Sequence, residues 1–171
     1  MGRRGCAAFA VLAVLASGCT QLVPASTLDL ERGQVSLRPL LDSDLVAIPG
    51  MGTSEITAAL GEPANSEVTE ASDDEPAGTV TTMQYDGLEI VVHELEKPQR
   101  SFISELVLRN RTYVPSVPVM VGARRDDVEE LLGEPATTEG DEVVYELTDD
   151  GDRCIVTYDG NRAEQVTFQF S

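Results

Sequence analysis

The sequence has few of the residues on which most catalytic and metal sites depend. Among its 171 residues there is one histidine, His93, so a catalytic triad or a multi-histidine metal site lacks the partners it needs. No phosphate-binding loop, nucleophile elbow or dinucleotide fingerprint is present either. We therefore expect a protein that is not an enzyme and that holds no metal ion and no cofactor.

Basic residues and cysteines are scarce too. Twelve Lys and Arg stand against 30 Asp and Glu, a formal net charge of −18 that disfavours nucleic acid and bare anionic lipid as partners. Of the three cysteines, Cys6 and Cys19 belong to the N-terminal segment, so Cys154 stands alone and an intrachain disulfide is excluded beyond that segment. Cys154 lies in an alternating apolar stretch, which predicts a buried thiol.

The N-terminus has the architecture of a lipoprotein signal peptide. Arg3 and Arg4 form a positive start, residues 5–16 are small and apolar, and small residues precede Cys19. This apolar run is shorter than the roughly 20 residues needed to span a bilayer. We therefore expect cleavage before Cys19 and lipid attachment at that cysteine, which would hold the mature chain on a membrane.

A duplicated segment organises the rest of the chain. Residues 50–64 match residues 122–136 at a constant offset of 72, and each copy has the pattern of a short helix that ends in Gly-Glu-Pro. Ser54 and Asp126 are the expected N-caps of these helices. A helix this short is unstable alone and must pack against other structure.

Strand patterns follow each of the two helices. Three runs separated by Asp- and Gly-rich turns come after each helix, which predicts an antiparallel meander. The polar stretch 65–78 before the first meander is expected to be a loop. The expected fold class is α+β, with two tandem units of one helix and a three-stranded antiparallel meander. The runs are Val80–Tyr85, Leu88–Leu95, Phe102–Leu108, Glu142–Leu147, Arg153–Tyr158 and Ala163–Phe170.

These patterns divide the chain into four segments. We expect a lipoprotein signal peptide at 1–18, a lipidated tether at 19–39, a first unit at 40–112 and a second unit at 113–171.

The first copy of the duplicated segment resembles the BamE/SmpA–OmlA family of outer-membrane lipoproteins. The resemblance rests on Gly50-Met51 before the helix and on the Ile-x-x-Ala-Leu-Gly-x-Pro run at residues 56–63. It implies two helices packed on a three-stranded sheet, with Leu40–Ala47, capped by Asp42 or Ser43, as the extra helix. It also implies a role in assembling β-barrel proteins in the outer membrane.

The chain departs from that family in three respects. It has two units and no Trp, and residues 114–118 contain two prolines where the second unit would need its leading helix. The tandem arrangement is similar to the β-lactamase inhibitor protein, whose two units share one sheet. That inhibitor depends on disulfides and an aromatic surface, whereas only 5% of this chain is aromatic, so the likeness implies a fold and not a shared function.

Four arginines gather near the junction of the units, and two interpretations stay open. One is that nearby acidic residues neutralise Arg124 and Arg125 within the second helix. The other is that Arg109, Arg111, Arg124 and Arg125 contact an acidic partner or a lipid headgroup.

The functional expectation is a non-enzymatic envelope lipoprotein that binds or scaffolds another envelope protein, possible roles being outer-membrane barrel assembly or envelope integrity. Its membrane contact would be the lipid on Cys19. In enteric bacteria an Asp directly after the lipidated cysteine favours retention in the inner membrane, but here Thr20 follows Cys19. In an organism with two membranes, the expected location is therefore the outer membrane, facing the periplasm. The alternatives are an inhibitor of an extracytoplasmic enzyme and a carrier of a small ligand or peptide.

Overall fold

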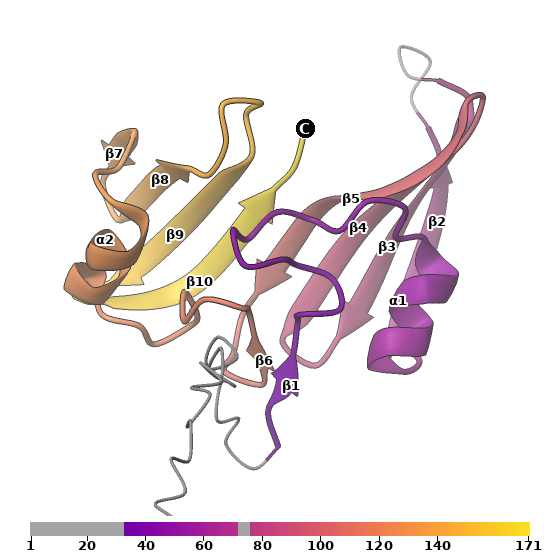
Figure 1. Cartoon of the computed structure of the whole chain (residues 1–171). Coiled ribbons are helices and arrows are strands. Elements are labelled where there is room, and N and C mark those ends of the chain that lie inside the picture. Colours follow the sequence, from indigo (N-terminus) through magenta and orange to yellow (C-terminus); the bar gives the residue numbers. More distant parts are fainter. Residues whose placement is uncertain (1–32, 72–75) are drawn as a thin grey trace, which may run out of the picture.

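A single antiparallel sheet of eight strands forms the body of the molecule. The computed structural model describes residues 33–71 and 76–171, and the sheet order is β2-β3-β4-β5-β10-β9-β8-β7 (Figure 1). The first half contains α1 Thr53–Leu60, β2 Asn65–Glu70, β3 Gly78–Tyr85, β4 Leu88–Glu96 and β5 Gln99–Leu108. The second half contains α2 Arg125–Leu132, β7 Thr137–Glu139, β8 Glu142–Glu146, β9 Arg153–Asp159 and β10 Arg162–Gln169.

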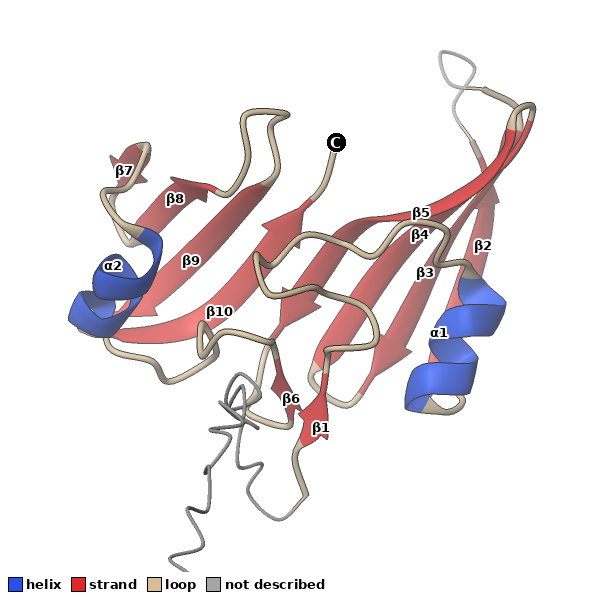
Figure 2. Cartoon of the chain, viewed as in Figure 1, coloured by secondary structure: helices blue, strands red, loops and turns tan. Residues whose placement is uncertain are grey.

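The two halves have the same build and join through their last strands. β5 pairs with β10 from Glu105↔Gln169 to Leu108↔Val166, so the two four-stranded meanders form one continuous sheet. Both helices lie on the same side of that sheet (Figure 2). The α+β class and the tandem helix-plus-meander arrangement are therefore confirmed, and the predicted strand runs all lie within or next to observed strands.

Each meander has four strands, so the expectation of three was wrong. β2 and β7 are additional edge strands, and β2 occupies part of the stretch 65–78 that was expected to be a loop. Every residue of both strands is exposed, so neither shows the alternation of a half-buried strand. β2 begins at Asn65 and β7 at Thr137, which extends the 72-residue offset beyond the duplicated segment.

The extra helix expected at Leu40–Ala47 is absent. Those residues form an irregular turn in which an Asp42 Oδ1 accepts hydrogen bonds from the N–H groups of Asp44 (2.9 Å) and Val46 (3.0 Å). Leu45 has a φ of 65°, which a helix does not allow. The aspartate side chain thus closes a turn instead of capping a helix, and Leu40, Leu41 and Leu45 are buried in the core.

A short parallel pair of strands begins before that turn. β1, Val35–Ser36, pairs with β6, Tyr113–Val114, and Leu37 is fully buried. Residues 35–37 lie in the range 19–39 assigned to the tether, so the folded part of the chain starts within that range. The signal peptide, Cys19 and the rest of the tether up to residue 32 lie outside the described residues.

Both helices begin earlier than expected. The N-caps are Gly52 and Arg124 instead of Ser54 and Asp126. At α1, the Thr53 N–H and Oγ1 donate to the carboxylate of Glu94 on β4 at 3.4 and 3.2 Å. A carboxylate far away in the sequence therefore supplies the acceptor that a local cap would provide. Both helices end before a glycine with positive φ, as predicted.

The hydrophobic core fills the space between the helices and the sheet. We call this side of the sheet the covered face, because α1, α2 and residues 37–52 lie over it (Figure 2). Strand residues that point to it include Ile90, Leu106, Val156, Val166 and Phe168, all fully buried. On β10, Val166 and Phe168 point to this face.

Candidate functional site

The sheet face opposite the helices has no covering helix or strand among the described residues. We call it the open face. One register row crosses all eight strands on this face, a distance of roughly 34 Å. Its members, in order across the sheet, are Asn65, Gln84, Glu89, Val107, Thr167, Ile155, Val144 and Thr137.

The centre of the open face is apolar and contains residues from both units. Val107 on β5 is only 4% exposed and Thr167 on β10 only 8%, while Ile155 and Val144 are half-buried. A polar frame surrounds them: Gln169 Nε2 donates to Glu105 Oε2 at 3.1 Å, and Arg109 pairs with Glu89 at 3.5 Å. An apolar centre with a polar rim is the composition of a protein-binding surface.

An aromatic cluster lies at one end of the open face, next to the β4–β5 turn. The His93 and Phe102 rings stack with centroids 5.0 Å apart, and the Arg100 guanidinium lies 4.7 Å from the Phe102 ring centroid. His93 is thus a packed strand residue. Within residues 33–71 and 76–171, no three His, Cys, Asp or Glu side chains are grouped so that they could hold a metal ion.

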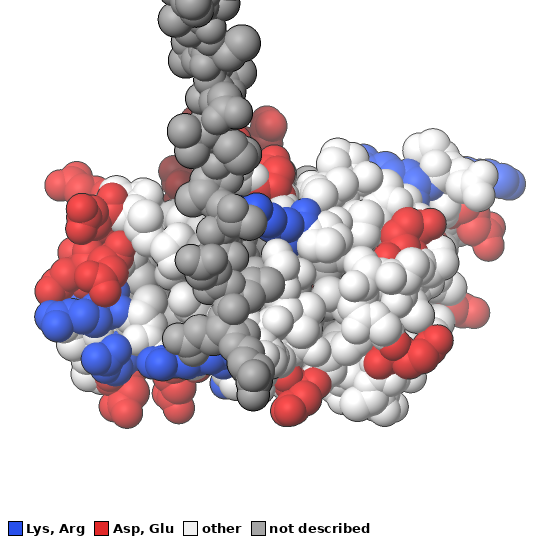
Figure 3. Space-filling model, turned by 60° about the horizontal axis from the view of Figure 1, so that its bottom comes forward, with Lys and Arg blue, Asp and Glu red and all other residues white. Residues whose placement is uncertain are grey.

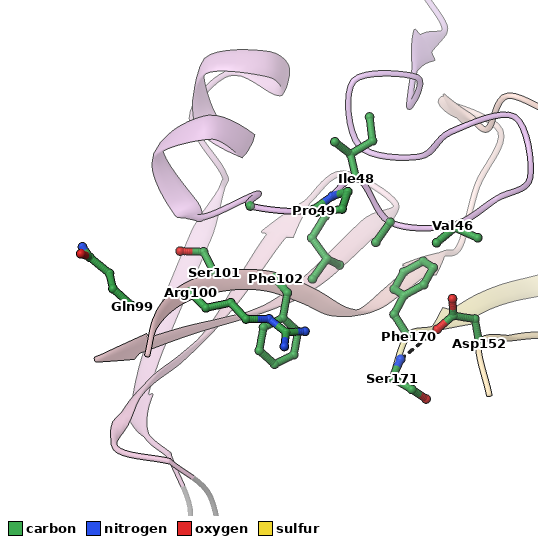
Figure 4. A pocket seen from close by; sticks show the side chains of 13 residues that line it. Val46, Ile48, Pro49, Gln99, Arg100, Ser101, Phe102, Asp152, Phe170 and Ser171 are labelled. Carbon is green, nitrogen blue, oxygen red and sulfur yellow. Dashed lines mark hydrogen bonds between the residues drawn. The ribbon is translucent and has the colours of Figure 1, made fainter. Parts of the chain in front are cut away.

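A cavity of about 610 Å³ lies where the two halves of the sheet separate above their junction (Figure 4). Its walls include Val46–Pro49 from the loop before α1, residues 99–103 of β5, and Phe170 after β10. The Ser171 N–H donates to Asp152 Oδ1 at 2.9 Å, which directs the chain after β10 away from β5. Most of the lining is apolar, and its polar part consists of Gln99, Arg100, Ser101, Asp152 and Ser171.

The four arginines singled out in the sequence do not form one patch. Arg109 is paired with Glu89 at the edge of the open face, and Arg124 with Asp126 at 3.5 Å. Arg125 packs against the core, with its Cζ 4.4 Å from the centroid of the Tyr158 ring. On the surface in Figure 3, Lys and Arg atoms gather mainly on the side of α2, and Asp and Glu atoms lie among them.

Arg111 has a neighbour that the sequence did not suggest. It lines a second cavity, of about 480 Å³, together with Arg162, whose Nη1 donates to the Gly122 carbonyl at 2.8 Å. Arg124 and Arg162 form an isolated β-bridge. The fold brings β10 back beside the start of α2. A shared basic surface would therefore consist of Arg111, Arg124 and Arg162 instead of the four arginines singled out in the sequence.

The one cysteine among the described residues has no reactive role in this geometry. Cys154 lies on the covered face and is fully buried, and burial raises the pKa of its thiol far above the ordinary value. The structural role expected from the sequence fits this position. Cys19, the candidate lipid site, lies outside the described residues.

Sequence reasoning missed the cavity beside β5. Its strand prediction began at Phe102, whereas β5 begins at Gln99, and nothing local shows where β10 stops pairing. The length of a strand reveals an unpaired edge only when the register of its partner strand is known.

Comparisons with known proteins add little on function. No protein-family model matches the chain, and no curated protein matches it. One similar solved structure is that of the uncharacterized protein yfeY from Escherichia coli, with 10% identity and a TM-score of 0.41. The match covers 80% of this chain and 99% of that one. In addition, none of the described helices has the length and apolar character required to cross a bilayer.

Proposed function

We propose that this chain is a cell-envelope lipoprotein that binds another envelope protein through the open face of its sheet and catalyses no reaction. The observation that carries the proposal is the apolar centre of that face, formed by Val107, Ile155 and Val144. Large contiguous apolar patches on the surface of a soluble protein mark sites that meet a partner.

The anchor in this proposal is the lipidated Cys19. The 15 residues from Cys19 to Gly33 span at most about 50 Å when fully extended. A partner would then be found within that distance of the membrane surface, either in the membrane or attached to it. In an organism with two membranes, we place the protein on the periplasmic side of the outer membrane.

A role of the BamE/SmpA–OmlA type, in the assembly of outer-membrane β-barrels, belongs to the same proposal. Its support is the Gly50-Met51 and Leu60-Gly61-Glu62-Pro63 pattern, together with a helix packed on a meander in each unit. The duplication doubles the width of the sheet, and the apolar centre lies where the two units meet. A partner would therefore contact both units at once.

Replacing one apolar side chain at the centre of the open face tests the binding surface. We expect Ile155→Glu to reduce capture of the partner from detergent-solubilised membranes at least roughly tenfold, because it introduces a charge that binding would have to desolvate. Quantitative mass spectrometry of the captured proteins measures the effect. The melting temperature should stay close to that of the wild type, since Ile155 does not face the core.

Leu131→Glu is the matched control. Leu131 is 45% exposed on α2, on the other side of the sheet, so this variant changes charge by the same amount without touching the open face. Equal capture by wild type and Ile155→Glu would refute the open face as the binding surface.

The lipid anchor has a separate test. We expect Cys19→Ser to abolish incorporation of a labelled fatty acid and to leave an unprocessed precursor, because the thiol is the acceptor of the diacylglycerol group. Cys154→Ser is the control and should label normally. Labelling that persists in Cys19→Ser would disprove the lipoprotein assignment.

A further inference from the structure

β5 is longer than the strand beside it, which leaves part of its edge open. Its ten residues pair with β4 over their whole length, but they pair with β10 only from Glu105 to Leu108. A β-bulge at Ser104 marks the end of that pairing, where the Phe170 N–H donates to the Ser104 carbonyl at 2.9 Å. Along residues 99–103, no described strand pairs with the other edge of β5.

The backbone groups on that edge point into the cavity described above. The Glu96 N–H donates to the Ala77 carbonyl on the β3 side. Because backbone N–H and C=O groups alternate in direction along a strand, those of Leu95 and His93 point toward β5. Their partners Arg100 and Phe102 point back toward β4. The N–H and C=O groups of the intervening residues, Gln99, Ser101 and Ile103, therefore point away from β4 and toward the cavity. Ile103 is only 1% exposed, so Gln99 and Ser101 are the residues whose groups a further strand can reach.

The residues that line the cavity also indicate that the edge of β5 faces it. Arg100 and Phe102 belong to the open face and Ser101 and Ile103 to the covered face, yet all four line the cavity. Residues of both faces can line one cavity only if it lies along the edge of the strand (Figure 4). The opposite wall is mainly apolar. The loop at Val46–Pro49 and Phe170 form it, with Asp152 and Ser171 beside them.

We propose that this edge of β5 accepts an extended peptide segment, which adds as a strand in the place that β10 leaves at Phe170. The unpaired N–H and C=O groups require a partner with an extended backbone. The apolar wall on one side selects apolar side chains at alternate positions. The net charge of −18 disfavours an acidic segment, so the peptide would be neutral or basic.

Two other sheet edges exist, but they lack these features. β2 and β7 end the sheet on either side, and all their residues are exposed, including Glu67, Glu70 and Glu139. Charged, fully exposed edge strands are protected against adding another strand. The β5 edge, in contrast, lies in an apolar cavity that would bury the bound peptide.

Peptide binding to the purified full chain tests the proposal. The probe is a fluorescein-labelled peptide, Lys-Thr-Val-Thr-Val-Thr-Lys, measured by fluorescence anisotropy with two N-methylated analogues. One analogue carries methyl groups on the valine nitrogens, the other on the threonine nitrogens. We expect binding of the unmodified peptide to saturate below about 1 mM and to slow amide exchange at Gln99 and Ser101.

Only one set of alternate nitrogens can face β5, so one analogue should lose binding at least roughly tenfold and the other should keep it. No saturable binding, equal behaviour of the two analogues, or exchange protection confined to β2 or β7 would each overturn the proposal. Because these peptide analogues act on the wild-type protein, the outcome does not depend on whether a variant folds.

A variant of the edge gives an independent check. Ser101→Pro removes an N–H that faces the cavity and leaves the β4 bonds in place, so it should weaken binding of the peptide at least roughly tenfold. Ser101→Ala keeps that N–H and should bind as the wild type does. Arg100 and Phe102 belong to both surfaces, but Ile155 does not line the cavity, so a negative result here would leave the Ile155→Glu test of the proposed function unaffected.

Discussion

At the scale of single residues, neighbouring arginines at the start of α2 have different roles. Arg124 is exposed and pairs with Asp126 in solvent, whereas Arg125 lies over the Tyr158 ring and its Nε is buried without a hydrogen-bond partner among the described residues. Arg125, one of the four arginines that cluster in the sequence, is therefore a packing residue. Of the four arginines, Arg109, Arg111 and Arg124 remain exposed candidates for contact with an acidic partner.

This difference predicts unequal costs of substitution. We expect Arg125→Ala to lower the free energy of unfolding by about 1 kcal/mol, because it removes a cation–π contact and the packing of the side chain on Tyr158. Arg124→Ala should change it by less than about 0.5 kcal/mol, since exposed ion pairs contribute little. Urea denaturation measures both. Equal effects of the two substitutions would argue against a packing role for Arg125.

At the scale of elements, β10 shows how one strand serves two surfaces. Val166 and Phe168 point to the core, whereas Gln165, Thr167 and Gln169 point to the open face. The strand pairs on both sides, with β5 and with β9, so its register fixes both the core and the centre of the candidate binding surface.

Neighbouring substitutions in this strand should therefore differ sharply. We expect Val166→Asp to lower the free energy of unfolding by about 3 kcal/mol or more, because the buried carboxylate has no partner. Gln165→Asp, on the other face, should cost about 1 kcal/mol or less. Thermal melts compare the two. A Val166→Asp melting temperature within a degree or two of the wild type would show that the facing of β10 is wrong.

At the scale of the whole molecule, the core contains weak acids that stay protonated. Burial is the main cause that raises the pKa of all four tyrosines, Tyr85, Tyr113, Tyr145 and Tyr158, and of the Cys154 thiol. The hydroxyls of Tyr145 and Tyr158 lie near each other, but no hydrogen bond of acceptable geometry links either to a described residue. The neighbouring Tyr158 hydroxyl acts to lower the pKa of Tyr145, but burial outweighs it and the net shift is upward.

These shifts predict a loss of stability in alkali. In the unfolded chain the thiol ionises near pH 8.5 and the tyrosines near pH 10, while the folded chain keeps these protons. The unfolded state then binds fewer protons, so the free energy of unfolding falls as the pH rises above about 8.5.

Melting temperatures between pH 7 and 11 test this, with tyrosinate absorbance at 295 nm as the second readout. Absorbance should rise together with unfolding. Tyrosines that titrate near pH 10 while the protein stays folded would contradict the assigned burial.

The sequence by itself determined the features that depend on near neighbours in the chain. The helix at Thr53–Leu60, its repeat at Arg125–Leu132, and the six half-buried strands follow from side-chain periodicity and turn residues, which act over a few positions. The duplication and the alternating stretch around Cys154 were readable for the same reason. The predicted lipid attachment at Cys19 likewise rests on a local pattern, and it stays a prediction because that residue lies outside the described residues.

Only the tertiary structure decided what depends on distant partners. β2 and β7 are exposed on both faces and exist because β3 and β8 offer hydrogen bonds to them. Glu94 caps a helix 41 residues away, which no local capping pattern shows. The apolar centre of the open face and the unpaired edge of β5 arise where β5 meets β10, since strand pairing is set by long-range register and not by either strand's own sequence.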